Sequence, residues 1–259
     1  MKMQLQYKTT RLGKFAYHFR KGNPLVVFMS GFGDFDTAQN FFKIISKLPN
    51  YYGILAPDYL NSGFSSRSIK SYTLSDEADQ IAKLINSSQA NFVILVAHSI
   101  GGVYAFQMRN EINHLQALVT IEPTTREIVL NPPRDKSYAE HQSIGPDFIQ
   151  NKIKELFSED KAKTFWQTTT KNAARFSEKD DQDAENALRK DSFWRKHDQL
   201  NDNIVSMIIT ESFRKAEYER SEYFNQNSNS KIVTFGSFHY IQWEYPQEIA
   251  KIIKNIIQK

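Results

Sequence analysis

Residues 91–107, NFVILVAHSIGGVYAFQ, carry the strongest fold signal in the chain. They begin with an apolar run, residues 92–97, rich in valine, isoleucine and leucine, as expected for a strand buried on both faces. The run stops at a serine and two glycines, and a helical pattern begins at Val103. The stretch therefore predicts a strand, a sharp turn and a helix, with Ser99 at the apex.

Small residues surround this serine. A turn this sharp strains the backbone at its apex and leaves room only for small neighbours. Ala97, Gly101 and Gly102 stand two before, two after and three after Ser99. This arrangement is typical of a nucleophile elbow, G-x-S-x-G, with Ala97 in place of the first glycine. The alternative is an ordinary helix N-cap at Ser99, and the rest of the chain favours the elbow.

The composition is that of one large α/β domain without thiol chemistry. The chain has 259 residues, 40% of them hydrophobic, and no cysteine, which excludes disulfides and thiolate metal sites. The first residues, MKMQLQYKTTRLGKF, contain no apolar signal segment, and no apolar run is long enough to span a membrane. The absence of cysteine and of a signal segment fits a cytoplasmic protein. The net charge of +4 is spread along the chain, so we expect no binding to nucleic acid.

Strands and helices alternate along most of the chain. Apolar runs predict strands at residues 3–10, 14–20, 24–29, 52–56, 92–97, 115–121, 203–210 and 230–235. Helical spacing predicts helices at residues 37–48, 74–85, 214–224 and 246–257, and another from Val103. This alternation predicts an α/β fold with a mostly parallel sheet and helices on both faces, preceded by an antiparallel strand pair.

One long segment breaks the alternation. Residues 124–200 have no buried-strand signature, and they show helical spacing near 148–157, 161–168 and 183–193. Such a segment is too long to be a loop. We therefore expect a helical insertion, residues 124–200, on a core formed by residues 1–123 and 201–259.

A serine nucleophile needs a base, usually a histidine held by a carboxylate. Among six histidines, only His239 stands just beyond the last apolar strand, next to Gly236. In a parallel sheet that place shares the carboxyl edge with Ser99. His98 adjoins the serine, but its side chain should point away from it. His239 is therefore the candidate base.

Two glutamates are candidate acids. Glu122 ends the strand after the elbow helix, and Glu211 ends the strand before His239, so either could orient the imidazole. An oxyanion needs two preorganised N–H donors. The backbone amide of Ile100, at the start of the elbow helix, and that of Phe32, between two glycines after the third strand, are the candidates.

Four motifs together resemble the α/β-hydrolase fold superfamily, in particular its cap-bearing serine hydrolase and esterase branch. AHSIGG at residues 97–102 is similar to the elbow, and GSFHYIQWEYP at 236–246 resembles the catalytic-histidine segment. SGFG at 30–33 resembles the oxyanion loop, with Ser30 where the family usually has histidine. PDYLNSGFSS at 57–66 resembles the D-x-x-G-x-G-x-S loop, with Asn61 and Ser62 in place of Pro-Gly.

The resemblance implies a catalytic triad and a cap over the site. The family's acid usually follows the strand after the insertion, where this chain has Glu211, but some branches place it before the cap, where Glu122 stands. We therefore expect the triad Ser99, His239 and Glu122, with Glu211 as the alternative acid. The family implies no metal or organic cofactor, and a small carboxylic ester as substrate (carboxylesterase-like, EC 3.1).

Two alternatives remain open. A serine aminopeptidase or amidase of the same fold would need an anionic handle for the amino terminus of its substrate, such as Glu127, Glu140 or Asp147. A non-catalytic ligand-binding relative would be expected to lack the nucleophile, base or acid. Ser99 and His239 both stand in place, which favours catalysis.

Overall fold

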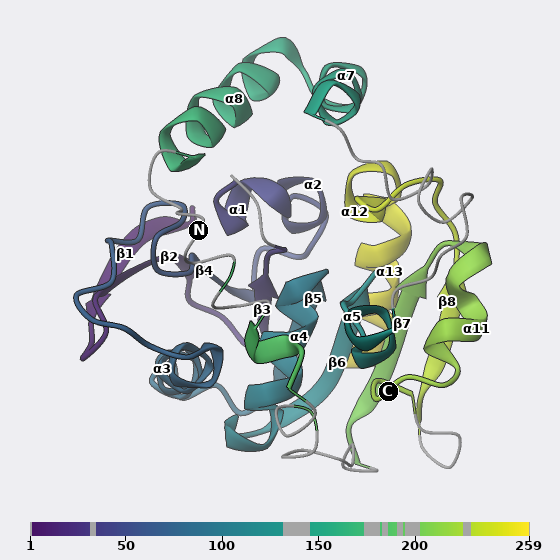
Figure 1. Cartoon of the computed structure of the whole chain (residues 1–259), viewed down its shortest axis with the longest axis horizontal. Coiled ribbons are helices and arrows are strands. Elements are labelled where there is room, and N and C mark those ends of the chain that lie inside the picture. The colour runs from purple at the N-terminus through teal and green to yellow at the C-terminus, as the bar shows by residue number, and fades with distance from the viewer. Residues whose placement is uncertain are drawn as a thin grey trace.

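The computed structural model describes residues 2–31, 35–131, 146–173, 182, 186–190, 194, 203–224 and 229–258. These residues form a mostly parallel sheet of eight strands in the order β1-β2-β4-β3-β5-β6-β7-β8 (Figure 1). The strands are β1 (Gln4–Thr9), β2 (Lys14–Arg20), β3 (Leu25–Met29), β4 (Gly53–Pro57), β5 (Val93–His98), β6 (Leu115–Ile121), β7 (Val205–Thr210) and β8 (Lys231–Thr234). Only the pairs β1–β2 and β2–β4 are antiparallel, which confirms the predicted α/β sheet.

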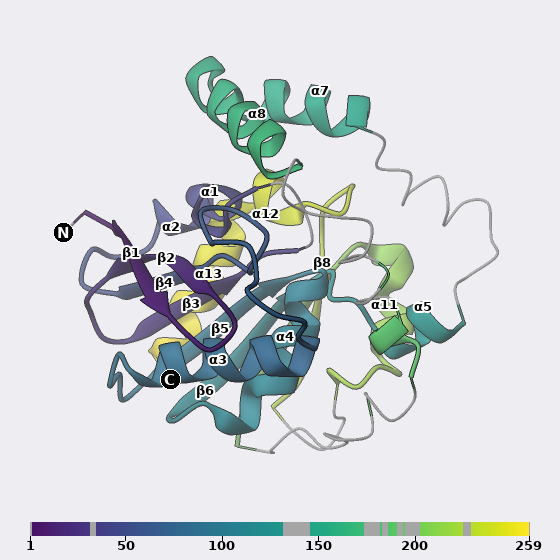
Figure 2. The ribbon, with the colours of Figure 1, turned by 60° about the vertical axis from the view of Figure 1, so that its left-hand side comes forward.

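Helices cover both faces of the sheet (Figure 2). The larger ones are α3 (Leu74–Asn86), α4 (Ile100–Met108), α7 (Pro146–Leu156), α8 (Glu159–Ala173) and α13 (Pro246–Ile257). The shorter ones are α1 (Thr37–Asn40), α2 (Phe42–Ile45), η1 (Arg109–Glu111), α5 (Arg126–Leu130), η2 (Ser212–Arg214), α11 (Lys215–Tyr218) and α12 (Ile241–Glu244). No helix in the described part of the chain is both long and apolar enough to cross a membrane.

Successive side chains of a buried strand point alternately into the two halves of the core. In β5, Leu95 and Ala97 face the cluster that contains α3 and α4. Ile94 and Val96 face the cluster that contains α2 and α13. Side chains alternate along a strand, so a strand between two helical layers must be apolar at every position. This is why the run at 92–97 contains no polar residue.

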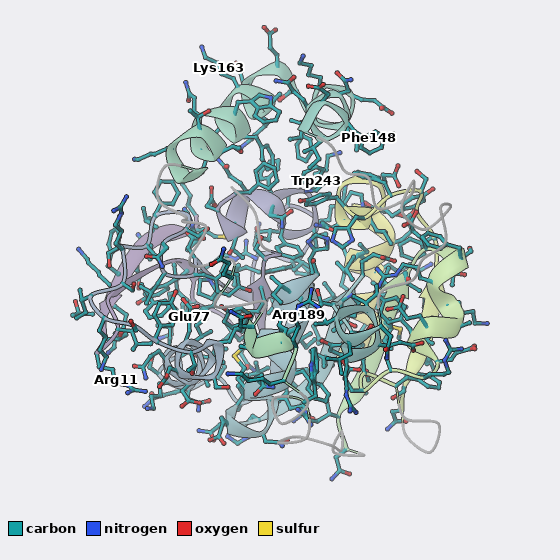
Figure 3. All side chains as sticks on the ribbon, in the orientation of Figure 1. Arg11, Glu77, Phe148, Lys163, Arg189 and Trp243 are labelled. Carbon is teal, nitrogen blue, oxygen red and sulfur yellow. The ribbon has the colours of Figure 1, made fainter. Side chains whose placement is uncertain are left out.

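The helices α7 and α8 lie outside these layers, over the end of the sheet where β5 and β6 terminate (Figures 1 and 2). They pack through a third apolar cluster, in which Phe157 and Phe165 contact Trp243 of α12 at ring-centroid distances of 5.6 and 5.7 Å. Trp243 lies beneath both helices in Figure 3. The same cluster includes Phe35 and Phe238, so these helices rest on the segments that flank the predicted oxyanion loop and His239.

Two predicted helices differ in the structure, and a third is mostly untested. The helix predicted at 37–48 is two short helices, α1 and α2, divided at Phe41, whose backbone has φ −102° and ψ 9°. The helix predicted at 214–224 is only η2 and α11, because Ser221 donates its hydroxyl and its amide to the Tyr218 carbonyl. Most of the helix predicted at 183–193 lies outside the described residues.

Candidate active site

Ser99 sits at the turn between β5 and α4 in a strained backbone conformation. Its φ is 53° and its ψ is −126°, a combination that residues with a side chain rarely adopt. The Ser99 amide donates to the Ile121 carbonyl at 3.0 Å, and the Ser99 carbonyl accepts from the amides of Gly102 and Thr124. Hydrogen bonds from three directions therefore hold the strained turn in place, and they leave the side chain at the edge of the sheet.

Close packing around this turn explains the nearby glycines. A Cβ on Gly101 would lie 2.5 Å from the carbonyl oxygens of Met29 and Ser30. A Cβ on Gly31 would lie 3.1 Å from the Cβ of Ser99. The segment after β3 can therefore approach the serine only because both positions lack side chains. The sequence predicts the oxyanion loop at this place.

Glu122, at the end of β6, is the second strained residue at this edge. Its φ is 45°, and its side chain is fully buried. The carboxylate accepts hydrogen bonds from the Thr210 hydroxyl at 2.5 Å, from the Glu211 amide at 2.8 Å and from the Arg214 guanidinium. Its charge is thus held by donors from the end of β7 and from η2.

These donors keep the buried Glu122 ionised. Burial acts to raise the pKa of Glu122, but the Arg214 charge, the His239 ring and the Thr210 hydroxyl together lower it to about 2. A buried carboxylate with such a low pKa needs specific compensation, and the Arg214 charge is the largest single contribution to it. The arginine is itself only 2% exposed.

His239 lies between this carboxylate and the end of β5. Its Nδ1 is 3.9 Å from Glu122 Oε2, within ion-pair range and longer than a hydrogen bond. Its ring lies 4.6 Å from the ring of His98, centroid to centroid. Nδ1 is thus the ring nitrogen that faces the carboxylate. The structure thus brings His239 and Glu122 together.

His98 holds the backbone of His239. The His98 Nε2 lies 2.9 Å from the His239 carbonyl oxygen; a carbonyl only accepts, so this nitrogen carries the proton. Burial, and then the charge of the neighbouring His239, lower the pKa of His98 well below its ordinary value. His98 is therefore neutral, and its ring lies against the histidine segment.

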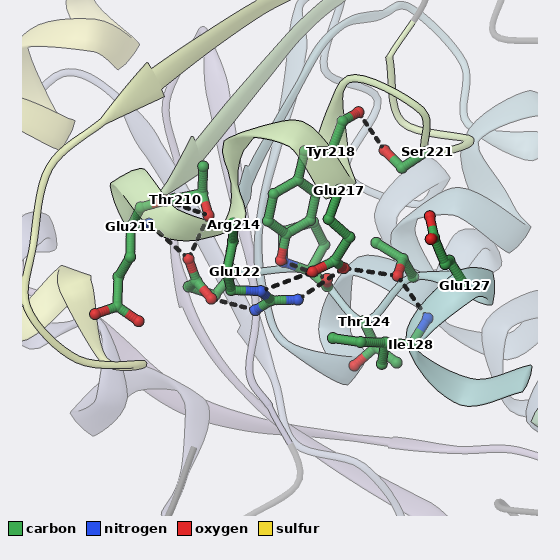
Figure 4. Close-up of polar contacts among 12 residues, drawn as sticks. Glu122, Thr124, Glu127, Ile128, Thr210, Glu211, Arg214, Glu217, Tyr218 and Ser221 are labelled. Atoms are coloured by element: carbon green, nitrogen blue, oxygen red, sulfur yellow. Dashed lines mark hydrogen bonds and ion pairs between the residues drawn. The ribbon is translucent and has the colours of Figure 1, made fainter. Parts of the chain in front are cut away.

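Glu211, the alternative acid, is also buried, being 3% exposed. Figure 4 shows its carboxylate directed away from Glu122 and Arg214. Its backbone amide, in contrast, is one of the donors to Glu122. The carboxylate of Glu122 lies 3.9 Å from the Nδ1 atom of His239.

Of the two predicted oxyanion donors, the structure describes Ile100 and not Phe32. Ile100 is the first residue of α4, where backbone amides have no partner within the helix. Phe32 lies outside the described residues. The preceding Ser30 is anchored on both sides: its carbonyl accepts from Tyr59 and its hydroxyl from Asn40, each at 2.8 Å. Asn40 also accepts from the Trp243 indole at 3.0 Å, which ties this loop to α12.

Sequence reasoning missed Arg214 and gave His98 no role. Arg214 stands in the charged stretch FRKAEYER, residues 213–220, which has the composition of a solvated surface. The guanidinium is buried because this stretch folds back against the end of β6. Among the described residues, no cluster of three or more His, Asp or Glu side chains could hold a metal ion.

Comparison with known proteins places this geometry among hydrolases. A family model described as "Alpha/beta hydrolase family" matches residues 26–252. The structure of Smu.1393c from Streptococcus mutans is similar over 100% of this chain and 98% of that chain, with 27% identity and a TM-score of 0.85. A putative epoxide hydrolase from Pseudomonas aeruginosa is 11% identical, with coverages of 99% and 95% and a TM-score of 0.76.

Two further matches add a lactonase and a mycobacterial protein. The N-acyl homoserine lactonase AidH is 14% identical over 99% of this chain and 97% of that chain, with a TM-score of 0.70. An uncharacterized protein of Mycobacterium tuberculosis H37Rv is 28% identical over 103 residues, which are 40% of this chain and 30% of the relative. The match to the family model spans the strained serine turn, the buried glutamate and the histidine segment alike, and the chain belongs to the alpha/beta hydrolase family.

Proposed function

We propose that this protein is a serine hydrolase that cleaves small carboxylic esters through an acyl-enzyme, with Ser99 as nucleophile, His239 as base and Glu122 as acid. The observation that carries the proposal is the strained backbone of Ser99, with φ 53°, at the junction of β5 and α4. Strain of this kind persists where function requires it. The 3.9 Å approach of His239 Nδ1 to Glu122 supports the two partner roles.

The proposed reaction proceeds in two balanced steps. His239 Nε2 takes the proton of the Ser99 hydroxyl as Oγ bonds to the ester carbonyl carbon, and the Ile100 and Phe32 amides stabilise the resulting oxyanion. The intermediate expels the alcohol, which leaves with the proton from His239. Water then attacks the acyl-enzyme by the same route, releasing the acid and restoring Ser99.

A serine at this position favours acyl substrates over alkyl ones. If Ser99 displaced a halide or opened an epoxide, the product would be an alkyl ether of serine, which water does not cleave under mild conditions. An acyl-serine is an ester and turns over readily. Esters are therefore the proposed class, and cyclic esters belong with them because AidH is named a lactonase.

An aminopeptidase or amidase of the same fold gains no specific support. Of its candidate handles, Glu127 pairs with Arg220 at the surface, 3.4 Å apart, and Asp147 is an exposed residue in the first turn of α7. Glu140 lies outside the described residues. The division into a core, residues 1–123 and 201–259, and a cap, residues 124–200, is part of the same proposal. In it, the cap restricts access to the site.

The first test is fluorophosphonate labelling, measured by intact mass. We expect one adduct on wild type, none on Ser99→Ala, and one on Ser46→Ala, a control at an exposed serine after α2. An unlabelled wild type that is folded, or equal labelling of Ser99→Ala, would refute the proposal. Rates on matched esters, lactones and amides then separate the esterase from the amidase.

A further inference from the structure

His98 is the last residue of β5, directly before Ser99, and it is only 1% exposed. Its backbone is fixed in the sheet by pairing with β6. Because side chains alternate along a strand, the His98 ring lies on the same face as Val96, toward the apolar cluster that contains Ile241 of α12. A rigid strand end thus holds this ring beside the segment that carries His239.

The His98 ring contacts the histidine segment by one hydrogen bond and by packing. Its Nε2 donates to the His239 carbonyl at 2.9 Å. Its centroid lies 4.6 Å from the centroid of the His239 ring and 4.9 Å from that of the Tyr240 ring. The 3.9 Å between His239 Nδ1 and Glu122 is longer than a hydrogen bond. The place of the His239 ring therefore depends on its own backbone and on its packing against His98.

Another side of the same ring faces the segment that follows β3. A Cβ on Gly31 would lie 3.0 Å from His98 Nδ1 and 3.4 Å from His98 Cε1, and also 3.1 Å from the Cβ of Ser99. The glycine thus lets this segment pack against the ring and the serine at once. His98 therefore contacts the histidine segment through Nε2 and the predicted oxyanion segment through Nδ1, while its backbone leads directly into Ser99.

We propose that His98 is a positioning residue that fixes where His239 stands relative to Ser99 and to the segment at Gly31. This inference rests on the proposed roles of Ser99 and His239 in catalysis. The Nε2–H group holds the His239 carbonyl, and the volume of the ring sets the spacing. Burial, and then the charge of the neighbouring His239, lower the pKa of His98 well below its ordinary value. The ring therefore stays neutral and has a single N–H to donate.

The histidine segment has further anchors on the core, so the role of His98 can be tested in a folded protein. Glu244 of α12 accepts from the amide of Ser237 at 3.0 Å and from its hydroxyl at 2.8 Å. The Phe235 amide donates to the carbonyl of the last residue of β7 at 3.1 Å. These bonds hold the chain just before His239. Loss of the His98 bond should therefore displace His239 and leave the fold in place.

The test compares wild type with His98→Phe and His98→Gln. Phenylalanine keeps the ring volume but leaves the buried His239 carbonyl without its donor, whereas the glutamine amide can place a donor near the position of Nε2. We expect His98→Phe to lower kcat on an ester by about a hundredfold and to keep KM within about twofold, because a small misplacement of a catalytic group slows the chemical step. His98→Gln should recover most of this loss.

Ser206→Ala is the matched control. The buried Ser206 hydroxyl, in β7, donates to the Tyr223 carbonyl at 2.6 Å, so this variant also removes a side-chain donor from a backbone carbonyl. We expect it to lower the urea midpoint, as His98→Phe does, and to keep kcat within about twofold of wild type. Equal losses of kcat in His98→Phe and Ser206→Ala, equal losses in His98→Phe and His98→Gln, or no loss in His98→Phe would overturn the inference.

Gly31→Ala tests the spacing from the other side of the ring. The added Cβ can be accommodated only if its neighbours give way by a few tenths of an ångström, and a displaced His98 ring carries its N–H donor with it. We therefore expect the ¹³C resonance of the His239 carbonyl to move in Gly31→Ala. An unmoved resonance would show that His98 does not link the two segments. This variant also keeps the inference testable if His98→Phe does not fold.

NMR also separates this inference from the hydrolase proposal, because it needs no turnover. Long-range ¹H–¹⁵N spectra show which ring nitrogen of His98 carries the proton, and the ¹³C shift of the His239 carbonyl shows whether it accepts a hydrogen bond. We expect a proton on Nε2 in wild type, an upfield carbonyl shift in His98→Phe and its recovery in His98→Gln. A proton on Nδ1, or an unchanged carbonyl in His98→Phe, would overturn the inference. The expected spectra without any fluorophosphonate labelling would instead keep the His98 contact and reject the hydrolase proposal.

Discussion

Strands β6 and β7 are each followed by a buried glutamate at the same edge of the sheet, and the two glutamates have different surroundings. Glu122 has a left-handed backbone, with φ 45°, and its carboxylate gathers the Thr210 hydroxyl, the Glu211 amide and Arg214. Glu211 has an extended backbone, with φ −67° and ψ 150°. The two residues have the same type and the same position after a strand. Only the backbone strain and the hydrogen-bond donors distinguish Glu122 from Glu211.

The largest expected effect separates the two carboxylates by activity. Glu122→Gln should lower kcat on an ester substrate by about a thousandfold or more, because the amide cannot stabilise the imidazolium. Glu211→Gln should keep kcat within a few-fold of wild type. Steady-state kinetics on both variants, with circular dichroism to confirm folding, make the comparison. A larger loss in Glu211→Gln would reverse the assignment of the acid.

The next effect concerns stability and pH. The pKa of Glu122 falls from 4.5 to about 2 on folding, so its charge stabilises the fold above pH 4.5, by about 3 kcal/mol. This contribution is lost as the pH falls from about 4.5 to 2. Urea denaturation of Glu122→Gln should show a deficit at pH 7 that shrinks over this range. A deficit that is constant with pH would mean that packing, and not the charge, is lost.

A surface control keeps that measurement specific. Glu219→Gln removes a carboxylate that is 46% exposed and pairs with Lys215 at 3.6 Å. Exposed pairs contribute little to stability, so this variant should lie within about 0.5 kcal/mol of wild type at pH 7.

The smallest effect compares two threonines on these neighbouring strands. Thr210→Val removes the 2.5 Å hydrogen bond to Glu122 and should lower the free energy of unfolding by about 1–2 kcal/mol. The Thr120 hydroxyl is buried and makes no hydrogen bond within the described residues, so Thr120→Val should be neutral or stabilising. Equal losses in urea denaturation would show that the bond to Glu122 contributes nothing.

The sequence predicted the framework well because buried strands must be apolar. The strand at 115–121 and the helix at 246–257 have the predicted limits, and Ser99 and His239 follow parallel strands at one edge. The Arg214 contact was not predictable, because it joins residues 92 positions apart and a charged stretch has the same composition whether exposed or folded back. The backbone strain at Glu122 was not predictable either, because a positive φ is usually indicated by a glycine and this position has none.

Trp243 gives the molecule an optical signal of its own. It belongs to α12 and is fully buried beneath the helices α7 and α8, with the rings of Phe157 and Phe165 against it. The chain has three tryptophans, so replacing Trp166 and Trp194 by phenylalanine would leave one emitter at this contact. Its emission wavelength would then shift to the red whenever α7 and α8 separate from the core, which makes intrinsic fluorescence a direct reading of that contact in solution.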